Sequence, residues 1–176
     1  MKNTENETQM IQLEPPDTHH LRSAEGWLEL GNLSEAGEEL KKISPQLHGH
    51  PAVLSVRYDI LAKGEKWADA AEVAGRLVKL MPDQPHVWTC LAYATRRKTG
   101  GGIPDAKQIL IESETKFPAE FLIRYNLACY ECQLGNLKAA MKWLKMAIEL
   151  AGEKDIRKMA LEDPDLEPLR REIARI

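Results

Sequence analysis

Apolar residues along this chain recur at the spacing of an α-helix, in segments about a dozen residues long. In the first segment Leu21, Ala24 and Leu28 fall on one helical face. Polar breaks separate the segments, and most of these breaks contain glycine. Proline stands where several segments begin, at Pro51 and Pro85, and its missing amide would be unpaired there anyway. The pattern predicts helices joined by short turns over residues 17–150, and no strands.

Four alanines indicate that the predicted helices come in pairs. They stand at 34-, 36- and 34-residue spacings and are Ala36, Ala70, Ala106 and Ala140. Each follows an apolar residue by three positions, namely Leu33, Trp67, Ile103 and Leu137. A period of about 34 residues with one helix–turn–helix in each copy is typical of a tetratricopeptide array.

Residues 18–150 resemble the tetratricopeptide-repeat (TPR) family, most clearly from Tyr125 to Leu150. The resemblance implies an all-α fold, a right-handed superhelical α-solenoid of antiparallel helix pairs. Four pairs are expected, at residues 17–50, 51–84, 85–118 and 119–150. An N-terminal tail at residues 1–16 is expected to be disordered, and residues 151–176 are expected to form C-terminal capping helices, because an open stack exposes an apolar end.

Several local features follow from residue chemistry. Asp17 or Thr18 is expected to cap the first helix, since a short oxygen-bearing side chain accepts from first-turn amides. Gly31 suits the left-handed backbone of a turn. The turn at Gly64 is predicted to be one residue longer than the family's usual turn, and the turn at 99–104 two residues longer than that of the last repeat. Trp67 is expected to face inward.

The resemblance also implies a function, because the first helix of each TPR pair lines a concave groove that binds peptides. The groove positions carried over from the family are Leu21, Glu25, Leu28, Leu54, Tyr58, Leu61, Thr89, Tyr93, Arg96, Arg97, Tyr125, Cys129, Cys132 and Gln133. They describe an apolar trough with a tyrosine on three of the repeats and a positive end at the two arginines. We expect a ligand segment with apolar anchors and an acidic residue near the third repeat.

One well-known TPR ligand is disfavoured. Co-chaperone grooves of the family clamp a terminal carboxylate with Lys and Asn in the first repeat and Lys and Arg in the third. The corresponding places here hold Leu21, Glu25, Thr89 and Tyr93. A carboxylate-terminal chaperone ligand is therefore not expected.

Composition narrows the class further. The chain has 176 residues, a formal net charge of −3 and a pI near 6.0, so no basic footprint predicts nucleic-acid binding. We expect a soluble cytoplasmic protein, because no apolar run approaches the ~20 residues of a membrane span and the N-terminus lacks a secretion signal. Residues 160–169 resemble an ending found on some bacterial TPR proteins.

Candidate chemistry is sparse, and neither an enzyme nor a cofactor is expected. Cys129 and Cys132 form a C-x-x-C that leaves a thiol-redox or metal role open, although a redox cysteine is favoured at a helix N-terminus and this pair falls mid-helix. The histidines at 19–20 and 48–50 lack nearby ligands at zinc spacing. The glycines at 100–102 lack the Lys-Ser/Thr of a phosphate loop.

The leading interpretation is a non-catalytic adaptor or scaffold that binds a protein partner of unknown identity. A dedicated secretion-type or assembly chaperone remains an alternative, since such proteins resemble this chain in size. Residues 10–14, Met-Ile-Gln-Leu-Glu, have the apolar and acidic character expected of a ligand. They suggest that the tail occupies the groove, in the same chain or in a neighbour of a homo-oligomer.

Overall fold

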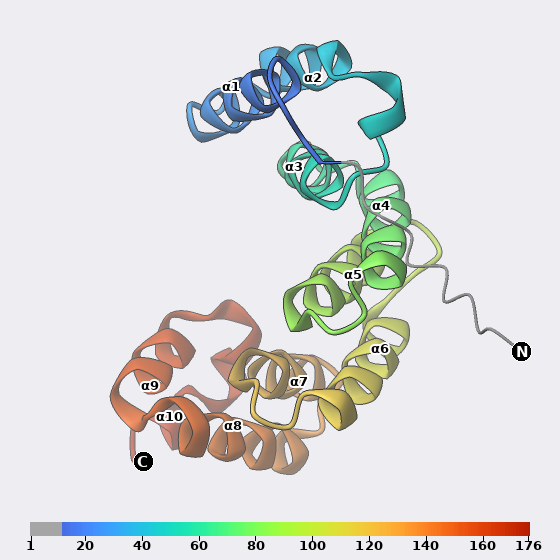
Figure 1. The fold of residues 1–176 in the computed structure, drawn as a ribbon. Coiled ribbons are helices and arrows are strands. Elements are labelled where there is room, and N and C mark those ends of the chain that lie inside the picture. The colour runs from blue at the N-terminus through green and yellow to red at the C-terminus, as the bar shows by residue number, and fades with distance from the viewer. Residues whose placement is uncertain (1–11) are drawn as a thin grey trace, which may run out of the picture. The chain divides into compact units, whose positions relative to one another are not determined.

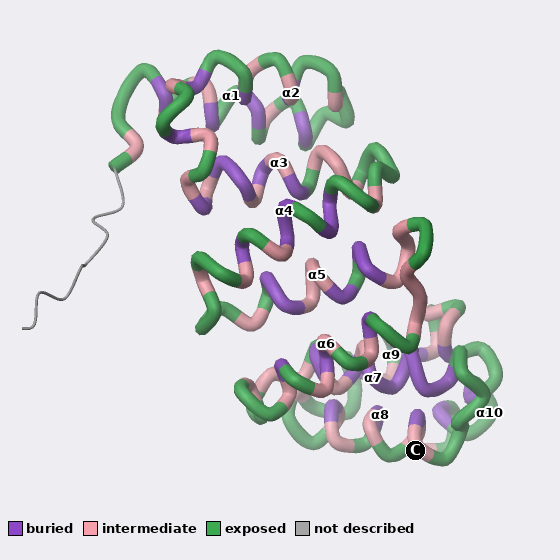
Figure 2. The backbone as a smooth tube through the Cα atoms, turned by 90° about the vertical axis from the view of Figure 1, so that its right-hand side faces the viewer, coloured by how far each residue is buried: buried purple, intermediate pink, exposed green. Residues whose placement is uncertain are grey.

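The computed structural model describes residues 12–176, and every regular element in that range is helical, which confirms the all-α prediction. Buried positions recur along each helix (purple in Figure 2), as an amphipathic repeat requires. The chain divides into two compact units, residues 1–66 and 67–176. The boundary falls inside the pair expected at residues 51–84.

The first unit contains α1 (Asp17–Glu29), α2 (Leu33–Lys42), a short 3-10 turn η1 (Pro45–Leu47) and α3 (Pro51–Lys63). Helices α1 and α2 pack side by side, and α3 packs against both. Leu21, Ala24 and Leu28 from α1 meet Ala36 and Leu40 from α2 in its core. Leu13, from the tail expected to be disordered, packs against this core. Residues 1–11, which include Met10 and Ile11, lie outside the described range.

The second unit contains α4 (Trp67–Leu80), α5 (Pro85–Arg97), α6 (Ile103–Lys116), α7 (Phe121–Gln133) and α8 (Leu137–Ala151). Each of these helices packs against the next (Figure 1). The C-terminal part follows with α9 (Glu153–Glu162), the 3-10 segment η2 (Pro164–Leu169) and α10 (Arg170–Ile173). Within the described chain, no helix has the length and apolar character needed to cross a membrane.

The periodic alanines hold the places that the sequence assigns to them. All four have no exposed surface. Helices α2, α4, α6 and α8 begin at Leu33, Trp67, Ile103 and Leu137, the apolar residues three positions before the alanines. The alanine therefore sits in the first turn of each second helix, where a larger side chain would have no space.

The turns correct one expectation and explain it. Residues 30–32, 64–66 and 134–136 each form a three-residue turn, so the turn at Gly64 is not longer than the others. Gly31 and Gly135 adopt φ of +78° and +79°, whereas Glu65 takes the equivalent place at φ +55°. Gly64 stands one residue too early to supply the left-handed conformation. The turn between α5 and α6, at residues 98–102, is two residues longer, as expected.

The expected cap of α1 is wrong. Pro16 is the N-cap residue and makes no side-chain cap hydrogen bond. The Asp17 carboxylate instead accepts from the Ser44 amide at 2.6 Å, beyond the end of α2. This hydrogen bond ties the start of the first helix to the end of the second.

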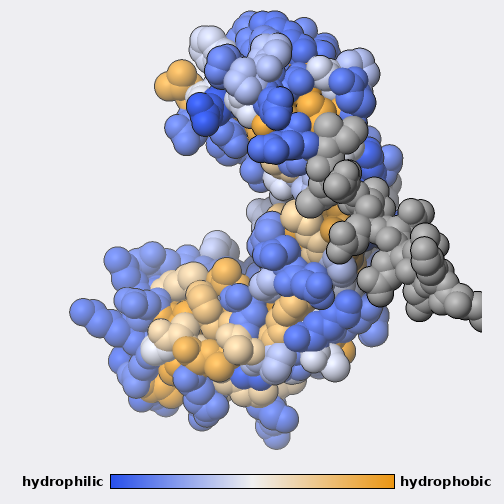
Figure 3. All heavy atoms as spheres, viewed as in Figure 1, coloured by the Kyte–Doolittle hydropathy of each residue, from blue (hydrophilic) through white to orange (hydrophobic). Residues whose placement is uncertain are grey.

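The C-terminal residues cover more than the end of the stack. Leu166, Leu169 and Ile173 are fully buried in the core of the second unit, with side chains of α7, α8 and α9. Segment η2 packs directly against α7, a first helix of the repeat pattern. On the visible face, apolar side chains gather on this unit (orange in Figure 3).

Candidate partner-binding faces

In the first unit, a hollow of about 540 Å³ lies between α1 and α3. Its lining residues are Glu25, Leu28, Glu29, Ala52, Ser55, Val56, Asp59 and Lys63. Glu25 and Leu28 were predicted groove positions. Leu28 and Val56 are largely buried and form an apolar floor, whereas the acidic residues are exposed. The Lys63 ammonium donates to the Leu28 carbonyl at 3.0 Å.

The other predicted positions of the first unit do not line this hollow. Leu21 is buried in the core. Leu54 and Tyr58 are also buried, and Leu61 is half-buried. Residues 52, 55, 56, 59 and 63 share one face of α3, and the predicted set at 54, 58 and 61 lies on another face of the same helix.

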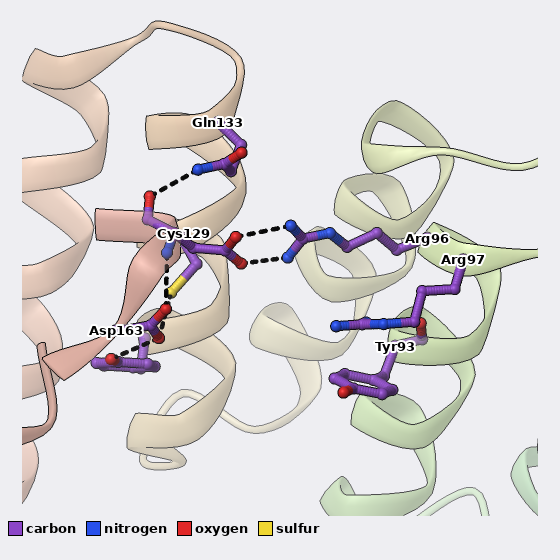
Figure 4. Close-up of polar contacts among 8 residues, drawn as sticks. Tyr93, Arg96, Arg97, Cys129, Gln133 and Asp163 are labelled. Atoms are coloured by element: carbon purple, nitrogen blue, oxygen red, sulfur yellow. Dashed lines mark hydrogen bonds and ion pairs between the residues drawn. The ribbon is translucent and has the colours of Figure 1, made fainter. Parts of the chain in front are cut away.

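In the second unit, the predicted groove residues of α7 contact the chain's own C-terminal segment (Figure 4). The Tyr125 hydroxyl donates to Asp163 at 2.9 Å, and the Cys129 thiol donates to the same carboxylate oxygen at 3.5 Å. The Gln133 amide donates to the Asp165 carbonyl at 3.0 Å. The inner face of α7 is therefore already covered.

Helix α5 contributes the charge that holds this segment. Both terminal nitrogens of Arg96 donate to the Asp165 carboxylate, one of them at 2.8 Å. The hydrogen bonds to Asp165 raise the pKa of Arg96, which stays fully charged. Asp163 in turn accepts from the Asp165 amide at 2.9 Å and closes the turn around Pro164. An aspartate of the chain itself thus pairs with Arg96, where an acidic residue of a ligand was expected.

The two cysteines of the C-x-x-C are buried beneath this segment. Burial, reinforced by the nearby carboxylates of Asp163 and Asp165, raises the pKa of the Cys129 thiol far above its usual range. Burial also raises the pKa of Cys132. Tyr130, on the same helix, has a pKa raised to about 12, chiefly by burial. Because thiolates are the nucleophiles and metal ligands, these thiols are poorly suited to either chemistry.

One cluster in the described chain has the composition of a metal site but not its electrostatics. Ligand atoms of Cys129, Asp163 and Asp165 lie within 4.8 Å of one another. Both oxygens of each carboxylate already accept hydrogen bonds, and Arg96 supplies the positive charge. A cation there would have to displace the guanidinium and deprotonate a buried thiol. These residues therefore do not fit a metal ion.

The histidine clusters stabilise local structure. His20 pairs with Glu39 at 2.9 Å, between α1 and α2. His48 bonds the Ile43 carbonyl at 2.8 Å, and His50 accepts from the Ala52 amide at the start of α3. These contacts hold three of the four imidazoles in the two clusters.

Next to the covered face, Tyr93 and Arg97 of α5 form a cluster with Trp67 of α4, in which Tyr93 is exposed and the other two residues are half-buried. The Arg97 guanidinium lies 3.4 Å from the Tyr93 ring centroid and 5.4 Å from that of Trp67. The two rings meet edge to face at 5.7 Å. Trp67 was expected to face inward, but it is half-buried and turned towards this cluster. Thr89, also predicted for the groove, donates to the His86 carbonyl of its own helix.

The structure thus brings together four of the predicted residues, Arg96, Tyr125, Cys129 and Gln133, around two aspartates that were not predicted. The sequence predicted only that these aspartates belong to the C-terminal capping segment at residues 151–176. A usable signal was nevertheless present, because residues 163–169 have the acidic and leucine-rich character predicted for the ligand.

Comparison with known proteins places the fold. No family model matches the chain, and no curated protein matches it. Among solved structures, a MamA RS-1 double mutant has a TM-score of 0.68 at 15% identity over 80% of this chain and 78% of that chain. MamA MSR-1 gives 0.61 at 16% identity, over 90% and 95%.

A putative kinesin light chain of Podospora anserina, described as having nearly identical TPR-like repeats, gives a TM-score of 0.57. Its identity is 17%, over 93% of this chain and 87% of that chain. Identities this low establish likeness of fold and nothing finer. This likeness of fold agrees with the helix pairs described above.

Proposed function

We propose that this chain, a TPR-type α-solenoid, is a non-catalytic protein-interaction module, an adaptor or scaffold that binds a segment of another protein on the faces of its first helices. The observation that carries the proposal is the packing of residues 163–169 against α7. Residues chosen as ligand contacts from the sequence alone hold a short, acidic, leucine-containing segment there. The face therefore has the chemistry of a peptide site.

Exchange of the chain's own segment for a partner would be costly. Fully burying an aliphatic side chain is worth about 1.5–3 kcal/mol, so exposing Leu166, Leu169 and Ile173 would cost about 5–9 kcal/mol. A partner binding at 1 µM gains about 8 kcal/mol in total, so displacing the segment would consume most of that free energy. The α7 face thus supports the second unit, and partners are left with the accessible parts of the other faces.

Two accessible regions remain on first helices. In the first unit it is the hollow between α1 and α3. In the second unit it is the exposed part of α5 around Tyr93, whose side chain is 43% exposed. A dedicated chaperone would use the same regions, and the identity of the bound proteins separates it from an adaptor. The raised pKa values of Cys129 and Cys132 argue against the thiol-redox alternative.

Affinity capture followed by mass spectrometry tests the proposal with three folded variants of the full chain. Ser55→Arg fills the hollow of the first unit, and Tyr93→Ala removes the exposed ring of α5. Lys79→Glu changes an exposed residue of α4, the second helix of its pair, and serves as the control. We expect at least one captured protein to be lost with Ser55→Arg or Tyr93→Ala and retained with Lys79→Glu. Capture of no protein, or full retention by both face variants, would reject the function.

A further inference from the structure

We propose that Trp67, Tyr93 and Arg97 form a binding site for a partner segment that presents one carboxylate, with an aliphatic or proline residue beside it. The carboxylate binds Arg97, and its neighbour packs against the exposed Tyr93 ring. This inference rests on the proposed function. It names the chemistry of the partner at one of the two accessible regions, the exposed part of α5.

The cluster is organised before any ligand arrives. Arg97 is held from below by the Tyr93 ring at 3.4 Å and donates one hydrogen bond, at 3.2 Å, to the Tyr93 carbonyl. Trp67 supports both residues from α4. A guanidinium has five N–H donors, so most remain for a carboxylate. Because the long side chain is already ordered, binding costs less conformational entropy than at a free surface arginine.

Charge selects an acidic ligand. Arg96 and Arg97 are consecutive on α5, and Asp165 neutralises Arg96 by a two-point ion pair. Within residues 67–176, no carboxylate pairs with Arg97, which contacts two aromatic rings and a backbone carbonyl. Lys98 follows directly in the sequence. A basic segment would be repelled here, and an acidic one would be attracted.

The contact of residues 163–169 with Arg96 shows which kind of segment suits this end of α5. There, an aspartate between a proline and a leucine meets Arg96, and the leucine turns into an apolar core. Tryptophan, tyrosine and arginine are also the residues that most often dominate binding energy at protein interfaces. A partly exposed trio of these three types, beside an internal example of aspartate recognition, favours a docking site over an ordinary solvated surface.

The test uses the full chain and a fluorescent peptide, Ser-Pro-Asp-Leu-Ser-Pro-Leu with blocked ends. Its control peptide has Asn in place of Asp. Fluorescence anisotropy should show at least tenfold tighter binding of the Asp peptide, weakening as salt rises. Arg97→Gln and Tyr93→Ala should each weaken binding at least fivefold. Arg76→Gln, which changes an exposed arginine of α4 by the same charge, should leave it unchanged.

Equal binding of the two peptides, absence of binding, or an Arg97→Gln variant that binds as the parent does would overturn the inference. Circular dichroism melting of each variant confirms that it is folded. The capture experiment separates this failure from failure of the proposed function. Proteins lost with Ser55→Arg but retained with Tyr93→Ala would keep the function and remove this site, whereas capture of no protein removes both.

Discussion

The first-helix faces of the two units differ in what covers them, although the repeat pattern treats them alike. Between α1 and α3 the described part of the chain leaves a hollow with an apolar floor and three carboxylates at its sides. On α7 the equivalent face is covered by η2, and its polar groups are paired with Asp163 and Asp165. Repeat position therefore predicts where a face lies, and residues outside the repeat decide whether it is free.

The charges of the two faces differ as well. Glu25, Glu29 and Asp59 surround the hollow of the first unit, where Lys63 is the one basic residue of the lining. The open part of α5 instead presents Arg97 over aromatic rings. If both faces bind partners, they are expected to bind segments of different charge.

The largest expected effect tests whether η2 is a structural cover. Leu166→Ala should lower the free energy of unfolding by about 2–5 kcal/mol, because the side chain is fully buried and its removal leaves a cavity. Chemical denaturation followed by tryptophan fluorescence measures the change. Leu30→Ala is the control, since Leu30 is 77% exposed and should change stability by less than about 0.5 kcal/mol. A loss below 1 kcal/mol for Leu166→Ala would mean that the cover is loosely held.

Thiol labelling tests whether η2 shields the cysteines of α7. Cys129 and Cys132 are buried and have raised pKa values, so the thiolate is scarce as well as shielded. At pH 8 both should react with iodoacetamide at least about a hundredfold more slowly in the folded chain than in the unfolded chain. Peptide mapping by mass spectrometry follows each site, and Leu166→Ala should accelerate labelling. Rapid labelling of the folded parent chain would show that the face is open.

A smaller effect is expected from the ion pair between α5 and the cover. Arg96→Gln should lower stability by about 1–2 kcal/mol, because a two-point hydrogen-bonded pair is lost at a partly buried site. A double-mutant cycle with Asp165→Asn isolates the coupling. Arg97→Gln, one residue away, should change stability little. Zero coupling between Arg96 and Asp165 would show that this ion pair does not stabilise the cover.

The smallest effect concerns the turn that ends the first unit. Glu65→Gly should raise stability by roughly 0.5–1 kcal/mol, since glycine adopts a φ of +55° without the steric cost that glutamate bears. Gly135→Ala should have the opposite sign in the equivalent turn of the second unit. Thermal unfolding of both variants gives the comparison. Destabilisation by Glu65→Gly would mean that the Glu65 side chain contributes a contact that outweighs the strain.

Much of the fold could be predicted because its signals are local or periodic. The alanine spacing located the start of every second helix, and proline located the starts of α3 and α5. The cap of α1 was missed because Asp17 has a partner 27 residues away, which no local rule reveals. Glu65 was missed because the nearby Gly64 was the more obvious turn residue.

The candidate site was less predictable, for a physical reason. Family positions selected Arg96, Tyr125 and Gln133 as ligand contacts, and in the structure these three residues contact Asp163 and Asp165 of the same chain. Nothing in the periodicity indicates that residues 163–169 return to α7. The choice of a partner-binding set therefore stays a prediction, now centred on the hollow and on the exposed part of α5.

Neutralisation of Arg96 by Asp165 has a consequence for ligand valence. The end of α5 has two adjacent guanidinium groups, but only one of them has charge to offer an incoming chain. A run of consecutive acids would bring its second carboxylate towards Asp165, which would repel it. We therefore expect the proposed site to favour a ligand with a single isolated acid, and polyanions such as phosphorylated clusters or acidic tails should be poor competitors for it.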